Sequence, residues 1–308
     1  MKPSGGSEIQ RWHLEENLKE NELDGINLIT STCHPDLIDR SKINVVWQQL
    51  SWDQQNVQYM ADRRFVDSVQ YFVYNSHWCY QRFRERFAIP EYKSTVIKNA
   101  TYKFDNVEKS KDDKIKLIYT STPWRGLNVL VKAIQHLNKT RDDFEVDVYS
   151  STKIYGSDFE KSEQDKFKPL FDACSNTKNI NYKGYGTNEE IRKSLEQAHI
   201  FSYPNNWEET SCIAAIEALT AGCYGVVTNF GALVETCTDF VTYVDYEPNV
   251  ELLAQRYAIV LSKVIDKYKN NEYDNLLKQQ VNYYNSFYSW DYRMLQWRDF
   301  FKSIKNGK

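Results

Sequence analysis

The chain has 308 residues and a formal net charge of −3, from 39 lysines and arginines against 42 aspartates and glutamates. This balance lacks the basic excess of proteins that bind the phosphate backbone, so nucleic acid is excluded as an expected partner. Hydrophobic residues make up 41% of the chain, whereas only 11 glycines and 7 prolines are present, which excludes disordered, collagen-like and linker-like proteins.

The sequence favours a cytoplasmic protein of two domains. No apolar run approaches the roughly 18 residues of a membrane-spanning helix, and the first ten residues show no apolar core of a secretory signal. The six cysteines form no C-x-x-C pair, which favours buried thiols in a reducing compartment. The length exceeds what one hydrophobic core comfortably serves, so we expect two domains.

Segments typical of helices and strands alternate in the first part of the chain. Short runs rich in β-branched and aromatic residues predict strands, and apolar residues three and four positions apart predict helices. Strands are expected at 26–31, 43–50 and 70–75, and helices at 7–21 and 76–88. The polar, lysine-rich stretch 102–114 carries no apolar period and predicts an exposed linker between domains.

A second alternating series follows this linker. Strands are expected at 115–120, 144–149, 179–182, 199–203 and 224–228, and helices at 126–138, 187–197 and 211–221. Thr187, with Glu190 three residues on, predicts a capping box at the start of one of these helices. Strands that alternate with helices indicate parallel sheets, so we expect an α/β fold with two Rossmann-like domains facing a central cleft.

The predicted domains span residues 1–110 and 111–285, and a last segment, 286–308, is expected to cross back to the first domain. Aromatic and basic residues mix in 80–88 and in 288–304. A helix packed on a domain surface is the favoured interpretation of both segments. The alternative is a helix that makes a peripheral contact with a membrane surface.

The segment 203–217 (YPNNWEETSCIAAIE) is the densest group of polar residues. It leads from a strand through a loop into a helix expected to begin near Thr210 or Ser211, both good N-cap residues. Free N–H groups and the dipole at such a helix start bind phosphate. Glu209 lies just before this point, and Glu217 lies roughly 6–9 Å beyond the first turn, within reach of ribose hydroxyls. The alternative is a capping role for Glu209 and a half-buried helical position for Glu217.

The residues that follow make this pattern more specific. Ala221 and Gly222 end the helix, a buried strand follows, and the sequence GALVE occupies 231–235. Together with Glu209 and Glu217, this block resembles the donor-nucleotide region of the family 4 glycosyltransferases of group 1, which have the GT-B fold. Tyr224 stands where the family usually has proline, a difference that affects the start of the strand rather than the chemistry.

The resemblance assigns roles to residues of the second domain. Arg125, before Gly126, takes the place of the basic residue that contacts the donor phosphates, and hydroxyl residues at 120–122 stand where the family often has a second arginine. Gly184 and Tyr185 match the loop beside the donor base. Glu209 and Arg125 are the expected catalytic residues. The expected donor-binding residues are Glu217, Thr210, Ser211, Cys212, Ile213, Tyr185, Gly184 and Thr122.

The first domain shows a partial resemblance. Gly5, Gly6 and Ser7 resemble the glycine loop that approaches the donor phosphate and the acceptor. The strand that should precede this loop is missing from the sequence, so the first sheet is expected to lack a central strand. His77 is a further candidate site residue near the sugar, and its alternative is a histidine at a helix start without a catalytic role. Five histidines without carboxylate spacing predict no metal site.

The resemblance implies an activity. Enzymes of this family transfer a sugar from a nucleotide-sugar donor, such as a UDP- or GDP-sugar, to an acceptor with retention at the anomeric carbon. The expected acceptor is a glycan or a lipid- or protein-linked sugar, and no cofactor or metal is expected. Two alternatives remain: a catalytically impaired nucleotide-sugar or glycan binding module of the same fold, and a nucleotide-sugar epimerase of the same two-domain architecture.

Overall fold

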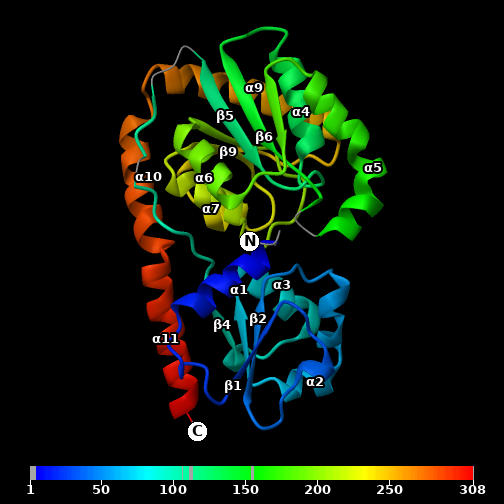
Figure 1. Cartoon of the computed structure of the whole chain (residues 1–308), viewed down its shortest axis with the longest axis vertical. Coiled ribbons are helices and arrows are strands. Elements are labelled where there is room, and N and C mark those ends of the chain that lie inside the picture. Colours follow the sequence, from blue (N-terminus) through cyan, green and yellow to red (C-terminus); the bar gives the residue numbers. More distant parts are fainter. Residues whose placement is uncertain (1–4, 106, 111–113, 154–155, 308) are drawn as a thin grey trace.

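The computed structural model describes residues 5–105, 107–110, 114–153 and 156–307, which form two parallel β-sheets surrounded by helices (Figure 1). The strand order is β1-β2-β3-β4 in the first sheet and β10-β9-β8-β5-β6-β7 in the second. Every neighbouring pair of strands runs parallel. The predicted α/β fold with two Rossmann-like sheets is confirmed.

The first sheet is built from the N-terminal third of the chain. Its strands are β1 (Ile26–Thr30), β2 (Ile43–Gln48), β3 (Tyr71–Tyr74) and β4 (Ser94–Val96), with helices α1 (Gly6–Asn17), α2 (Arg63–Ser68) and α3 (His77–Phe87). Among the described residues, α1 precedes every strand. The sheet is nevertheless continuous, because β1 pairs with β2 along its whole length, from Ile26 opposite Ile43 to Thr30 opposite Trp47.

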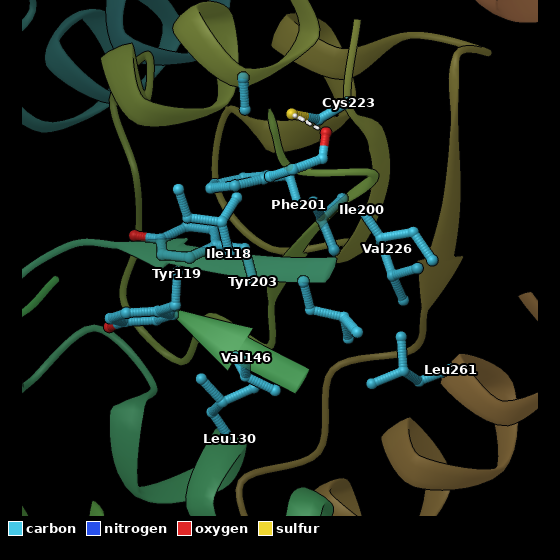
Figure 2. Close-up of a cluster of buried hydrophobic side chains, with 14 of the residues drawn as sticks. Ile118, Tyr119, Leu130, Val146, Ile200, Phe201, Tyr203, Cys223, Val226 and Leu261 are labelled. Carbon is cyan, nitrogen blue, oxygen red and sulfur yellow. Dashed lines mark hydrogen bonds between the residues drawn. The ribbon is translucent and has the colours of Figure 1, made fainter. Parts of the chain in front are cut away.

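The second sheet is larger and has helices on both faces. Its strands are β5 (Ile115–Thr120), β6 (Phe144–Tyr149), β7 (Ile180–Gly184), β8 (Ile200–Tyr203), β9 (Tyr224–Thr228) and β10 (Val241–Val244). Its helices are α4 (Leu127–Leu137), α5 (Ser157–Asn176), α6 (Asn188–Gln197), α7 (Ile213–Thr220), α8 (Leu233–Cys237) and α9 (Val250–Lys269). Figure 2 shows part of its core, where Ile118, Phe201 and Val226 come from three different strands. Such strands, buried on both faces, explain the continuous apolar runs in the sequence.

The predicted elements are found close to their expected positions. The capping box is confirmed: the Thr187 hydroxyl accepts from the Glu190 N–H, and the Glu190 carboxylate accepts from the Thr187 N–H. The predicted exposed linker is partly wrong, because Phe104 is buried in the core of the second domain. The Lys109 ammonium also lies inside, where it donates to the carbonyl oxygens of Leu195 and Ala221.

The chain crosses between the two sheets twice. It crosses first after β4, and it returns where α10 (Asp274–Phe287) meets α11 (Trp290–Asn306), which runs beside the first sheet (Figure 1). The two crossings are bonded to each other, since the Thr101 N–H donates to the Tyr288 carbonyl over 2.8 Å and Thr101 forms an isolated parallel bridge with Ser289. No helix in the described part of the chain is long and apolar enough to cross a membrane.

Helix α11 packs on the first sheet, as the favoured interpretation of 288–304 predicted. Trp297 is fully buried and meets Trp47 of β2 edge to face, with ring centroids 4.9 Å apart. Met294, Phe301 and Ile304 belong to the same hydrophobic cluster. The aromatic stripe of the sequence is therefore a packing surface. Helix α3 is similar, with Cys79, Phe83 and Phe87 buried on one side.

Replacing Trp297 with alanine tests this docking. Removal of a buried tryptophan leaves a cavity and should lower the free energy of unfolding by about 3–5 kcal/mol. Leu295→Ala is the matched control, since Leu295 is 59% exposed on the same helix and should change stability by about 0.5 kcal/mol or less. Urea denaturation measures both, and equal effects would contradict the packing described here.

Candidate functional site

A cleft of about 860 Å³ lies between the two domains. Its walls come from loops at the carboxyl ends of the strands in both sheets and from the N-terminal ends of α1 and α7. The expected site residues that line it are Gly5, Gly6, Ser7, Thr122, Arg125, Gly184, Tyr185, Glu209, Thr210, Ser211, Cys212 and Ile213. Residues predicted from distant parts of the sequence therefore meet at one place.

Strand order explains why the cleft is here. The chain proceeds outward from β5 to β6 and β7, and then returns to add β8, β9 and β10 on the other side of β5. Neighbouring strands β5 and β8 therefore send their following loops in opposite directions, which opens a crevice at their carboxyl ends. Arg125 lies in the loop after β5 and Glu209 in the loop after β8, so the topology places these two residues opposite each other.

Arg125 and Glu209 form a buried ion pair. The Arg125 Nη1 lies 2.6 Å from each Glu209 carboxylate oxygen, and the Tyr203 hydroxyl donates to Oε1 over 2.6 Å. The Glu209 side chain is 4% exposed and that of Arg125 27%. A carboxylate this deeply buried needs such partners, because an unpaired charge would be strongly destabilising. The two expected catalytic residues are thus each other's partner.

Two glycines allow the loops that carry this pair to approach closely. Gly126 has φ +94°, and a Cβ there would lie 2.2 Å from the carbonyl oxygen of Pro204. Gly231 has φ +63°, and a Cβ there would lie 2.5 Å from the backbone nitrogen of Glu209. Any side chain at either position would push the loop after β8 away. The Tyr119 hydroxyl holds the loop after β5 by donating to the carbonyl of Thr122 over 2.9 Å.

The start of α7 differs from the prediction. The helix begins at Ile213, with Cys212 before it at φ 61° and ψ 79°, so Thr210 and Ser211 are not its N-cap residues. The Thr210 hydroxyl cannot cap the helix, because it donates to the carbonyl of Gln49 and accepts from the amide of Asn75, both in the first domain. A non-glycine residue with positive φ stores backbone strain, which is typical of functional loops.

The glycine loop of the first domain meets α7. Gly5 precedes α1, and a Cβ on Gly6 would lie 2.9 Å from Cδ1 of Ile213, the first residue of α7. The N-terminal ends of α1 and α7 therefore converge beside the ion pair. Each end carries free N–H groups and a partial positive charge, which together favour an anion between them.

The far end of the cleft offers an aromatic ring and hydroxyl groups. Gly184, with φ +67°, leads into Tyr185, whose ring lies 5.1 Å from the Lys153 ammonium. Thr122 and Ser150 are nearly fully buried and also line the cleft. Their hydroxyl oxygens have no hydrogen-bond partner in the described structure. Buried oxygens of this kind are usually satisfied, so they are suited to the edge of a ligand or to water.

Two expected site residues lie outside the cleft lining. Glu217 is a further turn along α7, about 6 Å beyond Ile213, and burial raises the pKa of its carboxyl to about 7. His77 is the first residue of α3, where its ring is 67% exposed and its Nδ1 lies 3.0 Å from Glu235. The cleft thus reaches neither Glu217 nor His77.

Several contributing residues were not predicted. The Tyr203 hydroxyl bonds Glu209, and the Trp207 ring lies 5.9 Å from the Arg125 guanidinium. Gln49, Asn75 and Asn99 form a buried amide cluster on the wall of the first domain, joined by hydrogen bonds of 2.8 and 3.2 Å. Trp207 lies between the end of β8 and Glu208–Glu209 in the sequence, and this position could have indicated a place in the site. Nothing in the sequence indicated the amide cluster.

A double-mutant cycle tests the buried ion pair. Arg125→Met leaves Glu209 buried without its partner and should lower the free energy of unfolding by about 3–5 kcal/mol. Arg125→Met/Glu209→Gln removes both charges, so it should cost less than the sum of the two single changes, with a coupling of about 1–3 kcal/mol. Urea denaturation of the four proteins gives the coupling, and strict additivity would contradict the pair.

Glu217→Gln tests the raised pKa. The ordinary pKa of a glutamate, 4.5 here, rises to about 7 in the fold, so the folded protein holds a proton that the unfolded chain releases. The resulting stability is complete below pH 4.5 and is lost as the pH rises through 7. The difference in free energy of unfolding between the variant and the wild type should therefore shift in favour of the variant by up to about 3 kcal/mol between pH 4.5 and pH 8. Denaturation at several pH values measures this, and parallel pH profiles would contradict it.

Comparisons with known proteins identify the family and support the fold. The sequence profile of the family described as glycosyl transferases group 1 matches residues 99–276. A glycosyltransferase from Rickettsia africae has a TM-score of 0.68 at 15% identity, with 98% of this chain and 82% of that chain covered. No curated protein sequence matches the chain significantly.

Two further structural neighbours were solved with nucleotides. Anabaena Alr3699/HepE, in complex with UDP, has a TM-score of 0.66 at 13% identity over 87% of this chain and 73% of its own. The pneumococcal O-GlcNAc transferase GtfA, in complex with UDP and GlcNAc, has a TM-score of 0.64 at 12% identity over 97% of this chain and 60% of its own. With the family profile matching more than half of its length and the GT-B fold around its cleft, the chain belongs to the group 1 glycosyltransferases.

Proposed function

We propose that the protein transfers a sugar from a nucleotide-sugar donor to a hydroxyl of a sugar acceptor, with retention at the anomeric carbon and without a metal. The observation that carries this proposal is the position of Arg125. Its guanidinium lies at the point where the strand order reverses, beside two converging helix N-termini and the cleft. A cation and free N–H groups in such a place suit the diphosphate of the leaving group.

We expect one orientation of the donor in the cleft. The diphosphate would lie between Arg125 and the start of α7, with the base toward Tyr185 and its buried hydroxyl neighbours. Two neighbouring folds of this class bind UDP, which makes a UDP-sugar the first donor to test. Phosphate oxygens would compete with Glu209 for Arg125, and the released carboxylate would then accept hydrogen bonds from the sugar hydroxyls.

The reaction itself balances without a protein nucleophile. The bond between the sugar C1 and the diphosphate oxygen breaks, and the acceptor oxygen bonds to C1 on the same face. The proton of the acceptor hydroxyl moves to the departing phosphate oxygen. Arg125 and the N–H groups at the start of α7 would stabilise the negative charge that develops there. Closure of the two domains would keep water from competing with the acceptor.

A second candidate function rests on the charge of the cleft. Its described lining contains the carboxylates of Glu8, Glu189, Glu208 and Glu209 but a single guanidinium, that of Arg125. This guanidinium already faces a carboxylate. A site with this balance favours a glycan over a highly charged ligand, as expected for an impaired module that binds sugars without transferring them.

Activity measurements separate the two functions. We expect the wild type to release UDP from UDP-glucose or UDP-GlcNAc in the presence of a sugar acceptor, and NMR of the product should show the anomeric configuration of the donor. Arg125→Met should lower kcat/KM about 100-fold or more. The kcat/KM of Arg125→Lys should lie between that of the wild type and that of Arg125→Met, because lysine keeps the charge but not the planar guanidinium. Binding of glycans without nucleotide binding or transfer would support the impaired module instead.

Arg141→Met is the matched control for these variants. Arg141 is also an arginine of the second domain that lies in ion pairs, with Asp143 and Asp266, and its side chain is 12% exposed. It does not belong to the cleft lining. Its loss should reduce stability while leaving kcat/KM near the wild-type value at a temperature where the protein stays folded. Equal losses of activity in both methionine variants would refute the role of Arg125.

A further inference from the structure

The segment 75–78, which follows β3 and includes the first two residues of α3, contacts the second domain through each of its residues. The Asn75 amide donates to the Thr210 hydroxyl over 3.0 Å, and the Ser76 hydroxyl donates to the Thr210 carbonyl over 2.5 Å. The backbone N–H groups of His77 and Trp78 donate to the Glu235 carboxylate over 3.0 and 2.9 Å. Asn75 and Ser76 are 1% exposed, so the part of this contact at Thr210 is buried.

Glu235 is the anchor of this contact on the side of the second domain. Its carboxylate lies at the N-terminal end of α3, where the helix dipole favours an anion, and it also pairs with the ammonium of Lys98. These partners lower the pKa of Glu235 to about 2 in spite of its partial burial. The carboxylate is therefore ionised at every pH at which the protein is expected to work.

The same contact reaches the buried ion pair. Glu235 lies in α8, which begins directly after Gly231 and Ala232. The Ala232 N–H donates to the Glu209 carbonyl over 2.7 Å. The Thr236 hydroxyl donates to the Ser211 carbonyl over 2.6 Å. The loop 209–211 is thus held by the first domain in two ways: directly at Thr210, and indirectly through α8.

We infer that Glu235 and Thr210 are positioning residues, which hold the two domains closed and thereby fix Glu209 against the transferred sugar. The inference rests on the proposed function where it concerns the sugar, because Glu209 is given a role in transfer there. It reassigns Thr210, since the hydroxyl expected to contact the donor is used between the domains. Small misplacements of reacting groups reduce rates about 100-fold, so loss of this contact should act on turnover.

The experiment compares Glu235→Gln and Thr210→Val with two conservative variants, Lys98→Arg and Thr210→Ser. Small-angle scattering of the protein without nucleotide measures domain closure, and hydrogen exchange of the segment 205–212 measures the order of the loop. Calorimetry with UDP and steady-state transfer from a UDP-sugar measure binding and turnover. Glu251→Gln is the matched control, because Glu251 pairs with Lys132 and His136 within the second domain, and none of these three residues lines the cleft.

Glu235→Gln and Thr210→Val should show a larger radius of gyration and faster exchange at 205–212. Their kcat should fall about 10- to 100-fold, while the Kd for UDP stays within about threefold of wild type. Lys98→Arg, Thr210→Ser and Glu251→Gln should behave like wild type in all of these measurements. A residue that only stabilises the fold would lower the melting temperature without this split between kcat and UDP binding.

Two outcomes would overturn the inference. One is an unchanged radius and unchanged exchange in Glu235→Gln and Thr210→Val. The other is an equal loss of activity in Glu251→Gln. If the wild type transfers no sugar from any donor, the proposed function fails, and scattering with hydrogen exchange still decides whether the contact holds the domains and the loop.

Discussion

The buried pair of Arg125 and Glu209 is the interaction on which the rest of the cleft depends. The two loops that carry it can approach each other this closely only because glycines stand at 126 and 231, where a Cβ would collide with the backbone of Pro204 or Glu209. Burial of the carboxylate is tolerated only because the guanidinium and the Tyr203 hydroxyl satisfy its oxygens. A ligand that binds Arg125 therefore also changes the hydrogen bonds and the electrostatic environment of Glu209.

Much of the fold follows from local pattern. The apolar runs at 115–120 and 224–228 and the capping box at Thr187 each indicate their element, because burial and capping act within a few residues. The long helix α5 was not predicted, since its sequence is largely polar and contains Pro169. Strand β4 has only three residues and no buried one. Its pairing with β3 depends on the rest of the sheet.

The site shows the same division. Arg125, Glu209, Gly5, Gly6 and Gly184 were found because their sequence context resembles a known family, and the structure places them around one cleft. The partners of Thr210 lie more than 130 positions away in the sequence, and no local pattern could join them. The narrower assignment to family 4, the domain boundaries and the individual residue roles remain predictions. What the sequence could not supply is mainly the contact between the domains.

The paired crossings at Thr101 and Ser289 have a consequence for motion. Two covalent connections that are bonded at one point act as a hinge, because they leave rotation about a line through that point and resist separation or sliding. The contact of Glu235 with His77 and Trp78 is a separate link between the domains, and it must break when the domains rotate apart. The domains would then open by rotation about the paired crossings once the contacts at the start of α3 break. The rate of opening would depend on these few polar contacts rather than on the large apolar cores.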